Sequence, residues 1–135
     1  MSSTYSPADE DEEQLIDGWI RLQYSHSQGK PMDDLLWAHT VLDSICDRSP
    51  AECLRMILRI LERDSSDFIA GNLAAGPLED LLTRHGPAIV DAIESAALSK
   101  PRFREILGGI WRNLIREDVW DRIQALRLPE VGRSE

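Results

Sequence analysis

The chain has 135 residues, of which 42% are hydrophobic and 29% are charged, a composition typical of a single soluble globular domain. Its formal net charge of −9 at pH 7 disfavours nucleic acid as a partner, because phosphate groups repel an acidic surface. No apolar run approaches the roughly 20 residues that cross a bilayer, and the N-terminus lacks the features of a signal peptide, so we expect a cytoplasmic protein that does not bind membranes.

Three parts of the chain differ in composition. We expect a disordered N-terminal tail over 1–8, a single α-helical domain over 9–128 and a C-terminal tail over 129–135. The first helix is predicted over about 11–25, and Gly18 within it is expected to let another backbone approach closely. Its apolar residues follow the helical period of 3.6: Leu15, Ile16, Trp19, Ile20 and Leu22.

After a polar loop, a second helix is predicted over about 33–47, with Asp33 as its N-cap. The third helix has the clearest start in the chain. Ser49 is its N-cap, Pro50 takes the first helical position, and Glu52 completes a capping box. The body of this helix is apolar almost all round, which predicts a buried helix.

Two Gly-Pro pairs follow, and each predicts the end of one helix and the start of the next. Gly76 and Gly86 are expected to take the left-handed conformation that closes a helix, with a proline opening the next one. Helices are therefore predicted over about 67–75, 77–85 and 87–98.

A short helix from Pro101 to about Leu107 is predicted to break at Gly108 and Gly109, and a last helix covers about 117–127. No segment shows the alternation typical of a strand. The predicted fold class is all-α without a sheet: a compact array of about seven or eight short antiparallel helices, paired in hairpins that resemble HEAT units.

Few residues are arranged for chemistry. Cys46 and Cys53, the only cysteines, are predicted to be buried thiols that lie close together. His39 and Asp43 share a helix face, but no nucleophile accompanies them. His85 is expected to cap a helix end rather than to catalyse. We therefore expect no catalytic residues, no metal and no cofactor.

An arginine stripe at Arg55, Arg59 and Arg63 leaves two interpretations open. These side chains either pair with acids such as Asp43, Asp47 or Glu79, or they bind an anion, because the guanidinium fork suits carboxylate and phosphate. In the second case a ligand site lies between the third and fifth helices, with residues Arg55, Arg59, Glu79 and His85.

Charge is distributed unevenly along the chain. Residues 1–47 carry ten acids and two bases, whereas residues 100–127 carry four acids and seven bases. A partner with a basic surface would be attracted to the acidic part. The residues expected to bind it are Asp9, Glu10, Asp11, Glu12, Glu13, Asp17, Asp33, Asp34, Trp37, Asp43 and Asp47.

Four tryptophans are many for this length, and an exposed one, particularly Trp37 or Trp111, would be a natural interface anchor. The C-terminal helices carry Trp111 and Trp120, so dimerisation through them is an alternative. The bases and aromatics near Phe103 could stack on nucleic acid, but Phe103 fits a buried face and the net charge argues against it.

Residues 50–127 resemble a bacterial family of small α-helical domains of unknown function. The resemblance is carried by residues 54–61, by 73–82 (LAAGPLEDLL), 84–86 (RHG), 101–104 (PRFR), 107–112 (LGGIWR) and 119–126. It implies an all-α domain and supplies no activity and no catalytic residues.

The leading hypothesis is a non-catalytic, acidic protein-interaction domain, of which a bacterial immunity or inhibitor protein that binds a basic partner is one form. The alternative is a helical domain that binds a small molecule or anion, with or without enzymatic activity.

Overall fold

The computed structural model of this chain describes residues 7–30 and 33–127, with the backbone alone for residues 7–10. Within these ranges the chain is helical with connecting loops and no strand, which confirms the all-α class. The helices are α1 (Pro7–Ser27), α2 (Leu36–Arg48), α3 (Pro50–Arg63), α4 (Asp67–Leu73), α5 (Glu79–Ser99), α6 (Pro101–Ile106) and α7 (Glu117–Leu126). A π-helical segment (Ala74–Leu78) and a 3₁₀ turn (Leu107–Gly109) complete them.

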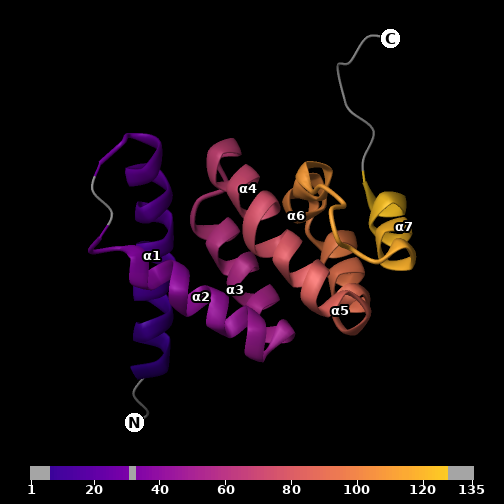
Figure 1. The fold of residues 1–135 in the computed structure, drawn as a ribbon, viewed down its shortest axis with the longest axis horizontal. Helices are drawn as coiled ribbons and strands as arrows, with labels where there is room; N and C mark the ends of the chain where they lie inside the picture. Colours follow the sequence, from indigo (N-terminus) through magenta and orange to yellow (C-terminus); the bar gives the residue numbers. More distant parts are fainter. Residues whose placement is uncertain (1–6, 31–32, 128–135) are drawn as a thin grey trace.

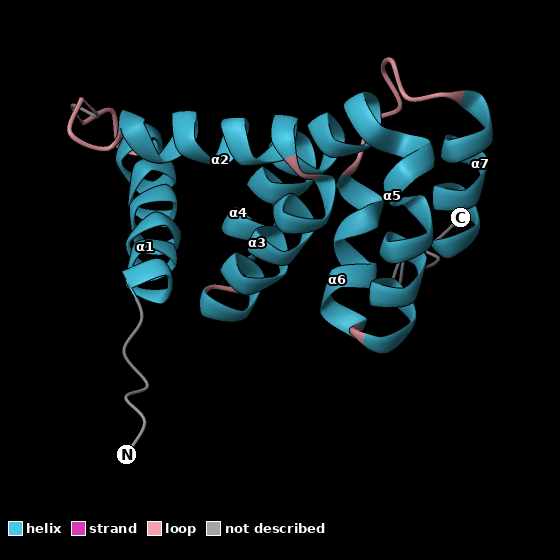
Figure 2. Ribbon diagram, turned by 90° about the horizontal axis from the view of Figure 1, so that it is seen from below, coloured by secondary structure: helices cyan, strands magenta, loops and turns pink. Residues whose placement is uncertain are grey.

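The helices are arranged roughly in chain order from one side of the molecule to the other, with α1 at one end and α7 at the other (Figure 1). Helix α5 packs against α3, α6 and α7. Figure 2 shows α2 crossing one end of α1 steeply, so these two helices do not form the antiparallel hairpin that we expected. The steep crossing brings α2 close to α1 at one point only.

That point is Gly18, as the sequence predicted. A Cβ atom built on Gly18 would lie 2.9 Å from Cζ2 of Trp37 and 3.3 Å from Cβ of Ala38, so a side chain here would push α2 away. Helix α1 begins at Pro7, about four residues before the predicted start, so Pro7 and Ala8 are helical and not part of a disordered tail. The rest of that tail and the C-terminal tail lie outside the described residues.

Of the two N-caps predicted by name, Ser49 is confirmed and Asp33 is wrong. The Ser49 side chain accepts a hydrogen bond from the Glu52 backbone N–H at 3.3 Å, and Ser66 caps α4 in the same way through Ile69 at 3.2 Å. Asp33, however, is not the N-cap of α2. The cap position is Leu35, which makes no side-chain capping bond.

The junction predicted at Gly76 and Pro77 does not exist. Both residues lie in the π-helical segment, and Gly29 is the only described glycine with a positive φ. Proline cannot donate to the carbonyl four residues earlier and its ring crowds that carbonyl, and a wider π turn accommodates both defects. The helical path therefore continues from α4 into α5, because both flanks are anchored in the core by Leu73, Leu78 and Leu81.

The second Gly-Pro pair bends the chain without stopping it. His85 has a non-helical backbone (φ −133°, ψ 21°), so α5 is kinked there, close to the predicted break. Gly86 itself is buried, and a Cβ atom on it would lie 3.1 Å from Cγ2 of Val119 on α7. Gly86 is therefore needed for the close approach of α5 and α7 and not for a left-handed helix end.

The core runs through the molecule around α3, as its apolar sequence predicted. Cys53, Ile57 and Ile60 on α3 are fully buried, and they join one hydrophobic cluster with side chains from every α-helix. Cys46 and Cys53 are buried free thiols that lie within hydrogen-bonding reach of each other, which confirms the prediction for this pair. The hydrogen bond with Cys46 and burial raise the pKa of the Cys53 thiol.

Candidate functional site

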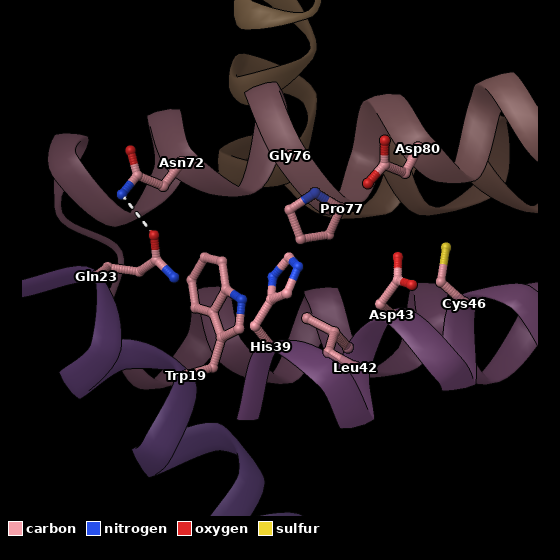
Figure 3. A pocket seen from close by; sticks show the side chains of 10 residues that line it. All are labelled: Trp19, Gln23, His39, Leu42, Asp43, Cys46, Asn72, Gly76, Pro77 and Asp80. Atoms are coloured by element: carbon pink, nitrogen blue, oxygen red, sulfur yellow. Dashed lines mark hydrogen bonds between the residues drawn. The ribbon is translucent and has the colours of Figure 1, made fainter. Parts of the chain in front are cut away.

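A pocket of about 180 Å³ lies where α1, α2 and α4 meet the π-helical segment and the start of α5. Figure 3 shows α2 along one side of this pocket and the π-helical segment along the other. The residues that line it are Trp19, Gln23, His39, Leu42, Asp43, Cys46, Asn72, Gly76, Pro77 and Asp80. We refer to it as the π-turn pocket.

The sequence of α2 explains one wall. His39, Asp43 and Cys46 are three or four residues apart, so they follow one another along a single face of the helix. Opposite them, Gly76 contributes no side chain and Pro77 contributes a rigid apolar ring (Figure 3). The pocket thus lies beside the segment where the helix widens from α to π geometry, a feature frequent at functional sites.

The end of the pocket near α1 is held by an amide pair. Asn72 Nδ2 donates a hydrogen bond to Gln23 Oε1 at 3.0 Å, and this bond joins α4 to α1 (Figure 3). Trp19, which is 2% exposed, lies beside the amide pair and supplies an aromatic surface. This end of the pocket is therefore rigid and partly apolar.

Two carboxylates from different helices mark the other end. Asp43 on α2 accepts a hydrogen bond from Arg84 at 2.9 Å. Asp80 on α5 forms no hydrogen bond or ion pair with any residue that the structure describes. Desolvation by neighbouring groups raises the pKa of Asp80, although the residue is exposed overall; Arg84 and His39 oppose this rise, and the negative charges of Asp43 and Glu79 add to it. An accessible carboxylate without an ion pair is stabilised by an added cation.

His85 lies behind this end of the pocket and has a structural role. Its Nε2 donates to the backbone carbonyl of Cys46 at 2.9 Å. In a regular helix that carbonyl would accept from residue 50, but Pro50 has no N–H to give. His85 thus caps a helix end, as expected, although the helix is α2 and not its own. The missing donor at Pro50 was the signal available in the sequence.

The arginine stripe on α3 pairs internally, and its partners are not the acids that we named. Arg55 and Arg59 both bind Glu12 on α1, each with one N–O distance of 2.5 Å. Glu13 pairs with Arg59 and Arg63, and Glu52 pairs with Arg55. The hydrogen bond from Arg55 is the main cause that lowers the pKa of Glu12. This ion ladder fastens the start of α1 to α3.

The remaining acids expected to bind a partner lie mostly on the surface. Asp11, Asp33, Asp34 and Asp47 are exposed, and Asp17 is exposed and pairs with Arg21 at 3.6 Å. Trp37 is 42% exposed. The side chains of Asp9 and Glu10 lie outside the described residues. Of the predicted binding residues, only Asp43 lines the π-turn pocket.

The four residues named for an anion or ligand site contact three different elements. Arg55 and Arg59 face α1, and His85 faces α2. Glu79 accepts hydrogen bonds from the backbone N–H of Trp111 at 3.0 Å and from Asn113 Nδ2 at 2.9 Å, in the loop before α7. Within residues 7–30 and 33–127, no three His, Cys, Asp or Glu side chains are grouped so that they could hold a metal ion.

The chain belongs to a family of unknown function (DUF6869), whose model matches residues 25–131 and therefore α2 to α7. The match confirms the resemblance found in the sequence. No curated protein and no solved structure is significantly similar to the chain. None of the helices in the described part is both long and apolar enough to span a membrane.

Proposed function

Starting from membership of a family without an assigned activity, we propose that this protein is a non-catalytic binding domain for a protein partner with basic side chains. The π-turn pocket would receive one lysine or arginine side chain of that partner. Asp80 carries the proposal, because it is an exposed carboxylate that lines the pocket, has a raised pKa and forms no ion pair among the described residues.

The size of the pocket favours a side chain over a whole metabolite. About 180 Å³ is less than the roughly 300–1,000 Å³ of pockets that enclose small molecules. Trp19 and Pro77 offer apolar surface to an aliphatic stem, and Asp43 and Asp80 offer carboxylates to a positive charge at the other end. These groups match an aliphatic stem that ends in a positive charge.

Charge outside the pocket supports the same kind of partner. Exposed acids lie on α1 and before α2, and residues 1–47 carry ten acids and two bases. This negative charge accelerates association with a basic protein. An immunity or inhibitor protein is the specific form we propose, in which the acidic domain covers the functional surface of a basic toxin or effector.

The test begins with purification of the tagged protein from its host and identification of a partner that co-purifies stoichiometrically. The affinity of the purified partner is then measured for the wild type, for Asp80→Asn and for Asp121→Asn. Asp121 is an exposed acid on α7, so the control removes the same charge outside the pocket. We expect Asp80→Asn to weaken binding at least tenfold and Asp121→Asn to change it little, with both affinities falling at high salt.

Equal affinity of all three proteins would refute a role for the pocket, and an acidic partner would refute the proposal as a whole. If the partner is a toxin, one equivalent of this protein should abolish its activity. If the activity of the partner is unchanged in the complex, the proposed binding function stands and the proposed inhibitor function is refuted.

A small cationic molecule is a second candidate ligand, because it would bring the same positive charge to Asp43 and Asp80 in the π-turn pocket. Putrescine, agmatine and Nα-acetylarginine amide are suitable probes. A rise in thermal stability with wild type that is absent with Asp80→Asn would support this candidate, and no rise with any probe would reject it.

A further inference from the structure

Large apolar side chains on the surface are gathered in two places. Among the described residues, six are exposed: Leu36, Trp37 and Val41 on α2, Trp111 and Leu114 in the loop between the 3₁₀ turn and α7, and Leu98. Trp111 is 73% exposed and Leu114 is 84% exposed. Exposed apolar side chains that cluster on a surface are typical of interaction sites.

The first cluster is acidic. Trp37 and Val41 are four residues apart on one face of α2, and Asp34 lies in the turn directly before this helix. Asp34 and Trp37 also line a groove of about 440 Å³ at the crossing of α1 and α2, together with Asp17 and Arg21. Residues 33–43 contain three aspartates and no lysine or arginine. We call Asp17, Asp34, Trp37 and Val41 the head patch.

The second cluster carries two arginines. Residues 111–116 contain Arg112 and Arg116 and no acid, and Glu117 and Asp118 follow at the start of α7. Both arginines are exposed, and Arg116 forms an exposed ion pair with Asp118 on α7. We call Trp111, Arg112, Leu114 and Arg116 the tail patch.

The tail patch is held in one conformation. Glu79 accepts hydrogen bonds from the Trp111 backbone and from the Asn113 side chain, and the Ile115 N–H donates to the Arg112 carbonyl at 2.8 Å. On either side of this turn, Ile110 and Ile115 are buried in the core. A loop that is already ordered loses little entropy when a partner covers it.

The two patches lie at opposite ends of the molecule, with the start of α2 beside α1 and the loop beside α7 (Figure 2). They cannot meet within one chain. Each offers apolar side chains, and each carries an exposed charge that forms no ion pair among the described residues, Asp34 in the head patch and Arg112 in the tail patch, so the two patches complement each other. Neither shares a residue with the π-turn pocket.

We propose that copies of this chain associate head to tail, with the tail patch of one copy on the head patch of the next. Trp111 and Leu114 cover the apolar surface around Trp37 and Val41, while Arg112 approaches Asp34. A contact between two different patches leaves one of each free, so it builds a chain of copies rather than a closed pair. The net charge of −9 opposes assembly only weakly at physiological salt, where charges more than about 8 Å apart are screened.

The experiment blocks each patch separately. Asp34→Ser with Val41→Lys blocks the head patch and spares Trp37, which packs on Gly18. Trp111→Ser with Leu114→Asp blocks the tail patch. Leu98→Ser is the control, because Leu98 is 70% exposed and lies in neither patch. Sedimentation velocity of the full chain over a wide concentration range gives the masses, and circular dichroism confirms folding.

We expect the wild type and Leu98→Ser to form species larger than dimers as concentration rises. Each blocked protein alone stays monomeric, and an equal mixture of the two forms a dimer that grows no further. A wild type that is monomeric at every concentration overturns the proposal. A mixture that stays monomeric also overturns it, since the free head patch of one variant then does not bind the free tail patch of the other. If a double variant fails to fold, Val41→Lys and Leu114→Asp alone replace it.

Discussion

Replacing Gly86 by alanine tests why this glycine lies at the kink of α5. A Cβ atom here would lie 3.1 and 3.2 Å from the two γ-carbons of Val119, closer than the 3.5–4.0 Å of favourable carbon contacts. Val119 is 2% exposed and β-branched, so it has one preferred rotamer and little room to move. Overpacking of this kind costs about 1–3 kcal/mol, and alanine returns up to about 1 kcal/mol in helix propensity. We expect Gly86→Ala to lower the free energy of unfolding by about 1 kcal/mol.

The reasoning makes a sharper prediction in a second background. Val119→Ala removes both γ-carbons, so Gly86→Ala should then stabilise the protein by up to about 1 kcal/mol. Gly71 provides the control, because it is exposed on α4 and a Cβ atom there would meet nothing within 4 Å. Gly71→Ala should stabilise the protein in either background.

Unfolding in guanidinium chloride, followed by circular dichroism, measures all six proteins. If Gly86→Ala costs the same free energy with and without the Val119 side chain, the backbone at residue 86 needs glycine for its own conformation. The packing argument would then be refuted.

Three further predictions concern charge and backbone conformation. Because folding raises the pKa of Asp80, the charged form of this side chain destabilises the fold, and Asp80→Asn should stabilise the protein at pH 7. This gain should disappear as pH falls below the ordinary aspartate pKa of 3.8. Denaturation midpoints at pH 7 and pH 3 check this prediction, and Asp121→Asn should show no such change. Because Arg55 lowers the pKa of Glu12, the ion ladder stabilises the fold above the ordinary glutamate pKa of 4.5, and this stabilisation is lost as pH falls through the lower pKa of the folded state. Glu12→Gln should therefore lower the free energy of unfolding by up to about 1 kcal/mol at pH 7 and by little at pH 3. An equal loss at both pH values would contradict a stabilising role of the charged ladder. Asn113 has φ 43°, and Asn113→Gly and Asn113→Val both lose its hydrogen bond to Glu79, so Asn113→Val should lower the free energy of unfolding by about 1–2 kcal/mol more than Asn113→Gly; equal losses would show that the left-handed turn is not maintained.

Features that depend on a few neighbouring residues were predictable from the sequence. The cap at Ser49, the buried helix α3, the break at Gly108 and Gly109 and the last helix all follow from signals within about one helical turn. The two cysteines were also predictable neighbours, because only a short turn separates α2 from α3. Such signals act through local backbone geometry and apolar periodicity, which the sequence states directly.

The candidate site was only partly predictable. His39 and Asp43 were recognised as a pair on one helix face, but Asp80, Asn72 and Gln23 were not connected with them. These residues come from α1, α4 and α5, and no local pattern says that the three helices converge beside α2. No local pattern around Asp80 marks it as part of a site.

The sequence by itself determined that the chain is helical, where most helices lie and which of their faces are apolar. The tertiary structure alone decided that the helix continues through Gly76 and Pro77, because burial of both flanks outweighs two local helix breakers. It also decided that Arg55 and Arg59 bind Glu12, which lies 43 and 47 positions away. A chain with 24 acids offers many partners to each arginine, and only the packing of α1 on α3 brings Glu12 and Glu13 to the stripe.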